Sequence, residues 1–167
     1  MDDSKIFRTL LPHERELLKE GKITNITHKG ATSAWLEAQS AVPVAGETNV
    51  YRVMGDKELL YLLEHNELPD TQPYQAIMEG PSGREYAEKY LHGKKYVNTK
   101  PTTIVEFTSP ENLIRELFKI QHKAEDGVLS TGLGNKAGNQ LKKFNESLSK
   151  KTTKWTIVKI KRPFTLR

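Results

Sequence analysis

Three short stretches of the chain are rich in β-branched and aromatic residues and alternate in part between apolar and polar positions. They are residues 49–54, 102–108 and 155–160, and each pattern is typical of a strand with one buried face. Pro163 follows the last stretch and is expected to end it, because proline has no backbone N–H for a neighbouring strand. The pattern therefore predicts three well-defined strands.

Two helical patterns precede the first of these strands. Residues 13–20 carry paired leucines, and Gly21 is a suitable C-terminal stop. A second short helix is expected from residue 32 or 33 to about residue 40. The small, Pro- and Gly-punctuated residues 41–47 then read as a turn-like boundary.

Four further helices are predicted, each from a start signal followed by apolar residues at helical spacing. Asp56 is a suitable N-cap for the first, and Ser82, within a Gly/Pro loop, for the second. Ser109 followed by Pro110 is a favoured start for the third. The fourth runs from about residue 140 to 148.

Strands and helices mix without a regular βαβ rhythm, which favours the α+β class. We expect a small mixed or antiparallel sheet packed with helices and preceded by a short helical N-terminal segment. The boundary divides the chain into residues 1–48, a helical N-terminal segment, and residues 49–167, the main domain.

The composition of the chain excludes several classes of protein. The 167 residues include no cysteine, so disulfides, thiolate catalysis and Cys-ligated zinc or iron–sulfur clusters are excluded. No run approaches the ~20 apolar residues of a membrane helix. The acidic N-terminus lacks the layout of a signal peptide. We expect a soluble basic protein that, if secreted, is a piece of something larger or uses another route.

Charge is distributed unevenly along the chain. Residues 136–167 hold ten of the 26 basic side chains and one of the 21 acidic ones, a net charge of +9. The preceding residues hold 16 basic and 20 acidic side chains, a net charge of −4. A dense positive field at one end of a mildly acidic body is suited to a phosphate-bearing partner.

A loop of small residues, Ser130–Asn139, lies at the start of this basic segment. Its spacing matches neither a Walker A motif nor a Rossmann fingerprint. Three glycines would let the backbone approach a ligand closely, and the loop carries hydroxyl, amide and lysine donors. An exposed turn without function is the alternative interpretation, although such loops are common at binding sites.

The lysines of the last strand have a structural interpretation as well. Lys159 and Lys161 share one face of that strand, where lysines also protect an edge from aggregation. Trp155 could stack on a base or belong to the core. Phosphate contact by this segment is the interpretation we favour.

Metal-free cleavage of RNA needs a base for the 2′-OH, an acid for the leaving 5′-oxygen and cations for the phosphorane. The chain has five histidines, and His92 and His122 are the candidates placed beside lysines. A solvated helix end is the more common explanation for each of them, and no pair has motif spacing. No cluster has metal-ligand spacing, so we expect neither a metal nor a cofactor.

Arg52 stands inside the apolar strand at 49–54. Such an arginine must face solvent, a partner carboxylate or a phosphate. Of these three options, a side chain that faces solvent on a two-sided strand is the most common.

Several motifs from residue 50 onward resemble the C-terminal toxin domains of bacterial polymorphic toxins. They are Tyr51-Arg52-Val53-Met54, a Glu58-Leu59-Leu60 helix, a Tyr86-Ala87-x-x-Tyr90 helix, Thr103-Ile104-Val105-Glu106-Phe107, and Gly132-Leu133-Gly134-Asn135-Lys136 with Phe144-Asn145 after it. The nearest kind is the tRNA-cleaving C-terminal domain of contact-dependent growth inhibition (CdiA-type) proteins.

This resemblance implies a ribonuclease that is delivered as part of a larger protein and cleaves tRNA in the target-cell cytoplasm. It implies neutralisation by a cognate immunity protein, which a basic active face predicts to be acidic. Some members of the family also use elongation factor Tu as a partner. Residues 1–48 would then serve cytoplasm entry or act as a linker.

The Tyr-Arg strand also resembles ADP-ribosyltransferase-like toxins, which hold NAD with an arginine on their first core strand. Those enzymes need a late catalytic glutamate, and here Glu146 is the only acid after Asp126, with no Glu-x-Glu or Gln-x-Glu pair. A non-enzymatic basic RNA-binding module is the other alternative.

The preferred hypothesis is a metal-independent tRNase. The residues expected to act at the scissile phosphate or as acid and base are His122, His92, Ser130, Thr131 and Lys136. The residues expected to hold RNA are Arg52, Lys94, Asn135, Lys142, Lys143, Lys154, Trp155 and Lys159.

Overall fold

The computed structural model describes residues 12–22, 25–28, 33–69, 76–92, 101–120, 123–125, 128–132 and 140–163. The chain forms two compact units. The first comprises Met1–Ser40 and Ile157–Arg167, and the second comprises Ala41–Thr156. Described residues from the N-terminal and C-terminal parts of the chain therefore belong to one unit, whereas the boundary expected at residue 48 was drawn from composition alone.

The first unit contains the helix α2 (Pro12–Lys19) and three strands, β1 (Asn25–His28), β2 (Ser33–Glu37) and the part of β8 (Lys154–Pro163) from residue 157 onward. The helix expected over residues 13–20 is thus confirmed, as is the last strand. β2 pairs antiparallel with β1 on one side and with β8 on the other. Its position between two strands buries Ala34, Trp35 and Leu36.

The helix expected from residue 32 or 33 to about 40 is wrong, because this segment contains β2. Its residues, Ser-Ala-Trp-Leu-Glu, have adequate helix propensity. Propensity is a weak preference that tertiary context overrides. Here the context is hydrogen bonding on both edges, with Leu36 opposite Ile26 on one side and Ile160 on the other.

The second unit is built on a sheet of five antiparallel strands, which confirms the expected α+β class. In spatial order the strands are β5 (Thr103–Pro110), β3 (Glu47–Met54), β4 (Ala76–Glu79), β7 (Val128–Gly132) and β6 (Lys123–Glu125). The pairing of β3 with β5 is the longest, from Glu47 opposite Pro110 to Met54 opposite Thr103. Both of these strands match stretches that the sequence pattern predicts.

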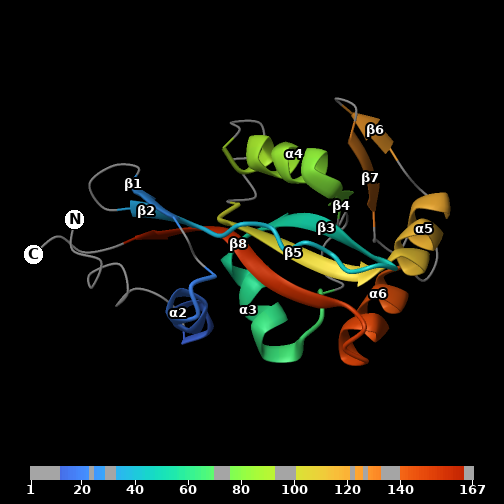
Figure 1. Cartoon of the computed structure of the whole chain (residues 1–167), viewed down its shortest axis with the longest axis horizontal. Helices are drawn as coiled ribbons and strands as arrows, with labels where there is room; N and C mark the ends of the chain where they lie inside the picture. Colours follow the sequence, from blue (N-terminus) through green and yellow to red (C-terminus); the bar gives the residue numbers. More distant parts are fainter. Residues whose placement is uncertain are drawn as a thin grey trace, which may run out of the picture. The chain divides into compact units, whose positions relative to one another are not determined.

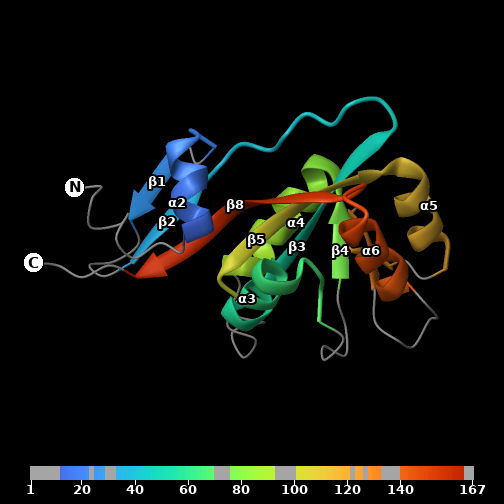
Figure 2. The same cartoon turned by 90° about the horizontal axis from the view of Figure 1, so that it is seen from below.

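Four helices pack on this sheet: α3 (Asp56–His65), α4 (Gly80–His92), α5 (Glu111–Ile120) and α6 (Gln140–Ser149). α4 lies on one face, whereas α3 and α6 lie on the other (Figure 1 and Figure 2). The side chains of Phe107 on β5 and Phe144 on α6 meet edge to face, with ring centroids 5.1 Å apart. Both are fully buried, so the apolar side of α6 is fixed to the sheet.

The predicted start signals of three helices need correction. Gly55 occupies the N-cap of α3, so Asp56 is its first residue. Ser82 lies inside α4, and the loop expected there is helical from Gly80 onward. Ser109 and Pro110 are the last residues of β5, and Glu111 begins α5.

The approach of α4 to β4 explains why two glycines stand at this helix start. Gly80 has a φ of +77°, which side chains other than glycine rarely adopt. A Cβ on Gly83 would lie 2.7 Å from the carbonyl carbon of Met78. The helix can therefore turn back sharply on the strand that precedes it.

Candidate nucleic-acid interface

Several residues chosen from the sequence lie outside the described ranges, namely His122, Lys94, Asn135 and Lys136. Ser130 and Thr131 are on β7, where their backbones pair with Met78 and Ile77 of β4. The segment from residue 130, where the glycine-rich loop was expected to begin, therefore starts as a strand between β4 and β6.

Three of the described lysines that were predicted to hold RNA are in the second unit. Lys142 and Lys143 are on α6 and Lys154 is at the start of β8, all in the second unit. Residues 140–156 of this unit contain five lysines and one glutamate, a net charge of +4. Four of these lysines are exposed: Lys142, Lys150, Lys151 and Lys154. We call residues 140–156 the basic segment from here on.

Trp155 is anchored to the end of α3. Its indole Nε1 donates a hydrogen bond to Asn66 Oδ1 at 2.8 Å. Asn66 is the C-cap of α3 and has a φ of 54°, a left-handed conformation that asparagine tolerates. The Asn66 amide also donates from Nδ2 to the carbonyl of Leu148 at 3.0 Å. One asparagine thus joins α3 to both ends of the turn between α6 and β8.

Asn145 fixes the middle of α6 in the same way. Its Oδ1 accepts a hydrogen bond from the backbone N–H of Leu68 at 2.8 Å, and its Nδ2 donates to the Leu68 carbonyl at 3.0 Å. This is a two-point contact with a single backbone residue. The side-chain amides of Asn66 and Asn145 therefore hold the basic segment to the end of α3 and to the chain that follows it.

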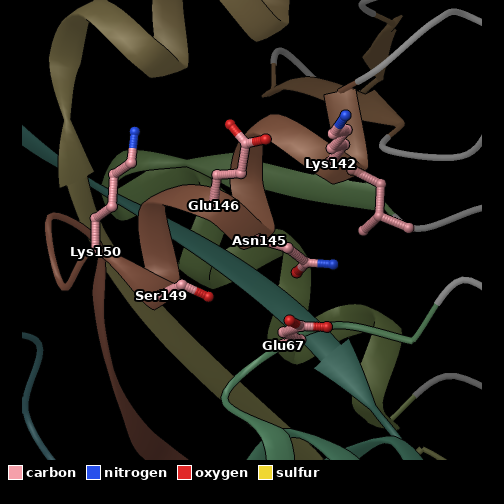
Figure 3. Close-up of a pocket in the computed structure, with 7 residues that line it drawn as sticks. Glu67, Lys142, Asn145, Glu146, Ser149 and Lys150 are labelled. Carbon is pink, nitrogen blue, oxygen red and sulfur yellow. The ribbon is translucent and has the colours of Figure 1, made fainter.

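A cavity of about 420 Å³ lies between α6 and the chain that follows α3 (Figure 3). Glu67 lines it on one side, and on the other side it is lined by Leu141, Lys142, Asn145, Glu146, Ser149 and Lys150. Lys142 and Glu146 are four residues apart on one face of α6, and Lys150 directly follows the helix. The two glutamates of the lining offset its two lysines, so this cavity itself has no net charge.

Arg52 makes a buried ion pair with Glu58, which is in the first turn of α3. The Arg52 Nε and Nη2 atoms donate to the two Glu58 carboxylate oxygens at 2.5 and 2.7 Å. Of the three options that the sequence left open, the partner carboxylate is the one observed. Because Arg52 is only 6% exposed, we do not include it among the proposed RNA contacts.

Lys159 and Trp35 form a contact in the first unit. The Lys159 and Lys161 ammonium groups lie 5.7 and 6.0 Å from the centroid of the Trp35 ring. Cations at this distance are attracted to the ring and also cover it. His92, the remaining candidate, is exposed at the C-terminal end of α4.

A polar cluster that the sequence did not indicate lies at the other end of β3 from Arg52. The Thr48 hydroxyl donates to Glu79 Oε2 at 2.7 Å, and the Arg115 guanidinium is ion-paired with the same oxygen through Nη2. Arg115 Nε is also 3.8 Å from Glu111 Oε1, one helical turn earlier on α5. We call Thr48, Glu79 and Arg115 the Glu79 cluster.

The Glu79 cluster adjoins both features predicted to bind RNA. Glu79 directly follows Met78, the residue paired with Ser130 on β7. On α5, Arg115 directly precedes Glu116, whose carboxylate accepts a hydrogen bond from Lys143 Nζ at 2.5 Å. Glu79 is therefore next in sequence to the partner of Ser130, and Arg115 is next in sequence to the partner of Lys143.

Three observations complete the description of the chain. Among the described residues, no group of three or more His, Cys, Asp and Glu side chains is placed to hold a metal ion. No helix in the described ranges has the length and apolar character needed to cross a membrane. No protein-family model matches this chain, and no curated protein and no solved structure is significantly similar to it.

Proposed function

We propose that this chain is an antibacterial toxin domain, a metal-independent ribonuclease that cleaves tRNA. The resemblance of its motifs to tRNA-cleaving toxin domains motivates the choice of substrate. In this proposal the domain is delivered as part of a larger protein and acts in the target-cell cytoplasm.

The exposed lysines of the basic segment are the observation that supports the proposal best. Lys142 is on α6, whose opposite side is fixed by Phe144 and whose flank is fixed by Asn145. Lys150, Lys151 and Lys154 follow this helix, in the turn to β8 and at the start of β8. Lysines on a rigid scaffold can track a phosphate backbone without a large cost in ordering the chain. Their net charge of +4 over residues 140–156 suits a polyanion.

The proposed chemistry keeps the residues chosen from the sequence, apart from the buried Arg52 and from Lys159, which lies over Trp35. Ser130, Thr131, Asn135 and Lys136 contact the scissile phosphate, and His122 or His92 acts as acid or base. Lys142, Lys143, Lys154 and Trp155 hold flanking RNA, with Lys94 in a secondary role. Neutralisation by an acidic immunity protein follows from the same positive surface, and elongation factor Tu is a partner that the resemblance suggests.

The ADP-ribosyltransferase alternative is less well supported. It assigns Arg52 to the binding of NAD, but both oxygens of Glu58 engage the Arg52 guanidinium in the protein interior. An arginine held in this way would have to break a buried ion pair to bind a ligand, which is costly.

Expression in a bacterial host without a cognate inhibitor tests the proposal. We expect growth arrest, and sequencing of the ends of cellular tRNA should show cleavage at a defined position. Growth arrest with intact tRNA and consumption of NAD would favour the transferase. Salt-dependent RNA binding without toxicity or cleavage would favour a non-enzymatic RNA-binding module.

A further inference from the structure

We propose that Glu79 is the general base of the ribonuclease and that Arg115 stabilises the transition state. This inference rests on the proposed function and changes one part of it, because Glu79 takes the place of His122 or His92 as the base. Neither Glu79 nor Arg115 is among the residues chosen from the sequence. The argument begins with the geometry of the Glu79 carboxylate.

The carboxylate of Glu79 has one oxygen occupied and one available. Thr48 Oγ1 and Arg115 Nη2 both contact Oε2. Within the described part of the chain, Oε1 makes no hydrogen bond. The side chain is 17% exposed, so that a substrate hydroxyl can reach it while two neighbours hold it in one orientation. An oriented and accessible carboxylate is what general-base catalysis requires.

Arg115 is suited to the second role. Its side chain is 46% exposed, and its guanidinium lies directly beside the carboxylate. A guanidinium presents five N–H donors in a fixed plane, which allows it to bind a carboxylate and a phosphate together. A phosphate held by Arg115 would therefore place the adjacent ribose near Glu79. The cation would also stabilise the charge that develops on the phosphorane.

The proposed step is an internal transesterification of RNA. Glu79 Oε1 takes the proton of the ribose 2′-OH while the 2′-oxygen bonds to phosphorus. The bond from phosphorus to the 5′-oxygen breaks, and that oxygen takes a proton from water. The hydroxide left by the water is neutralised by the proton on Glu79, so that the carboxylate is restored. The products are a 2′,3′-cyclic phosphate and a 5′-hydroxyl end.

The position of the cluster agrees with this step. Glu79 directly follows Met78, which pairs with Ser130, one of the residues proposed to contact the scissile phosphate. On the other side, Lys143 reaches Glu116, the residue next to Arg115. RNA that follows the basic segment across α5 would therefore pass Arg115 and Glu79.

Two substitutions of Glu79 separate a catalytic role from a structural one. Glu79→Gln keeps the length of the side chain and an oxygen that accepts the Thr48 hydrogen bond, but it is not basic. Glu79→Asp keeps a carboxylate but shortens it. A general base predicts that the aspartate variant is the more active, whereas a purely structural role predicts the reverse order.

The experiment measures cleavage of unmodified tRNA by the full chain, with kcat and KM determined separately. We expect Glu79→Gln to lower kcat by at least about 100-fold with KM within about twofold, and Glu79→Asp to retain more activity. Arg115→Lys, which keeps the charge but loses the planar fork, should lose about tenfold or more. Thermal unfolding of each variant identifies any that fail to fold.

Glu116→Gln is the matched control, because Glu116 is on the same helix and pairs with a cation on a neighbouring element. It should cleave at the rate of the unmodified chain. If the unmodified chain cleaves and Glu79→Gln cleaves equally well, or if the glutamine variant is more active than the aspartate variant, this inference is wrong and the proposed function stands. If the unmodified chain leaves tRNA intact, both are wrong.

Discussion

Two of the arginine–glutamate pairs in the second unit, Arg52–Glu58 and Arg115–Glu79, share their chemistry and differ in their surroundings. The side chains of Arg52 and Glu58 are 8% and 5% exposed, whereas those of Arg115 and Glu79 are 46% and 17% exposed. The first pair bridges β3 and the helix that follows it. The second bridges β4 and a helix that begins 32 residues after Glu79.

Burial strengthens the attraction within an ion pair and raises the cost of exchanging either partner. In the interior the attraction between the partners is strong, but neither can exchange its partner without leaving an uncompensated charge. At a partly exposed site water lowers both the attraction and the cost of exchange. The pair of Arg52 and Glu58 thus contributes to the stability of the fold, while Arg115 and Glu79 are able to bind a substrate. The predictions below test this contrast, in order of decreasing effect.

Breaking the buried pair should have the largest effect. Arg52→Met leaves the Glu58 carboxylate buried without a cation, and the free energy of unfolding should fall by about 3–5 kcal/mol. Urea unfolding followed by circular dichroism measures the loss. The double variant Arg52→Met with Glu58→Leu should recover most of it, since no buried charge remains. A loss below about 1 kcal/mol in the single variant would contradict the buried assignment.

Breaking the exposed pair should change catalysis more than stability. We expect Arg115→Gln to lower the single-turnover rate of tRNA cleavage by about 100-fold, as removal of a transition-state donor does. The free energy of unfolding should change by less than about 1 kcal/mol, as for other exposed pairs. A large loss of stability with an unchanged rate would instead make the two pairs alike.

Removing lysines should act on RNA binding alone. In the triple variant Lys150→Gln, Lys151→Gln and Lys154→Gln, the slope of log affinity for single-stranded RNA against log salt should fall by about 2 in magnitude. Fluorescence anisotropy over a series of salt concentrations gives this slope. Because all three lysines are exposed, the midpoint of urea unfolding should not change. An unchanged slope would show that RNA does not follow the basic segment.

The smallest effect should come from the ion pair of Lys143 with Glu116. Both side chains are about half exposed, at 42% and 52%. Glu116→Gln should change the free energy of unfolding by less than about 1 kcal/mol and leave tRNA cleavage unaltered. Comparison with Arg115→Gln on the same helix would show whether the position of a charge or its exposure alone decides its role.

Most of the fold could be predicted where local pattern and tertiary packing agree. The strands at 49–54, 102–108 and 155–160 and the helices α2, α3, α5 and α6 have strong periodicity and were expected near their observed bounds. β2 was not, because its hydrogen bonds come from β1 and from β8, and the latter lies more than 120 residues away in the chain. The short strands β4, β6 and β7 carry too few residues for a period to be recognised.

The candidate site likewise has one part that could be predicted from the sequence and one part that could not. The lysines of the basic segment are visible in the sequence because they are contiguous. Thr48, Glu79 and Arg115 were missed because they come from three separate elements and form no motif. Their only sequence signal is a charged residue at the end of an apolar strand, as in Ala76–Glu79, and many surface glutamates share it.

By itself, therefore, the sequence determined the α+β class, the absence of thiol chemistry and the concentration of positive charge near the C-terminus. These depend on composition and on neighbours along the chain. Only the tertiary structure decided that Arg52 is enclosed with Glu58, that side-chain amides fix the basic segment, and that Arg115 meets Glu79 on a partly exposed surface. Burial and partner choice depend on residues far apart in sequence, and these are brought together only when the sheet forms.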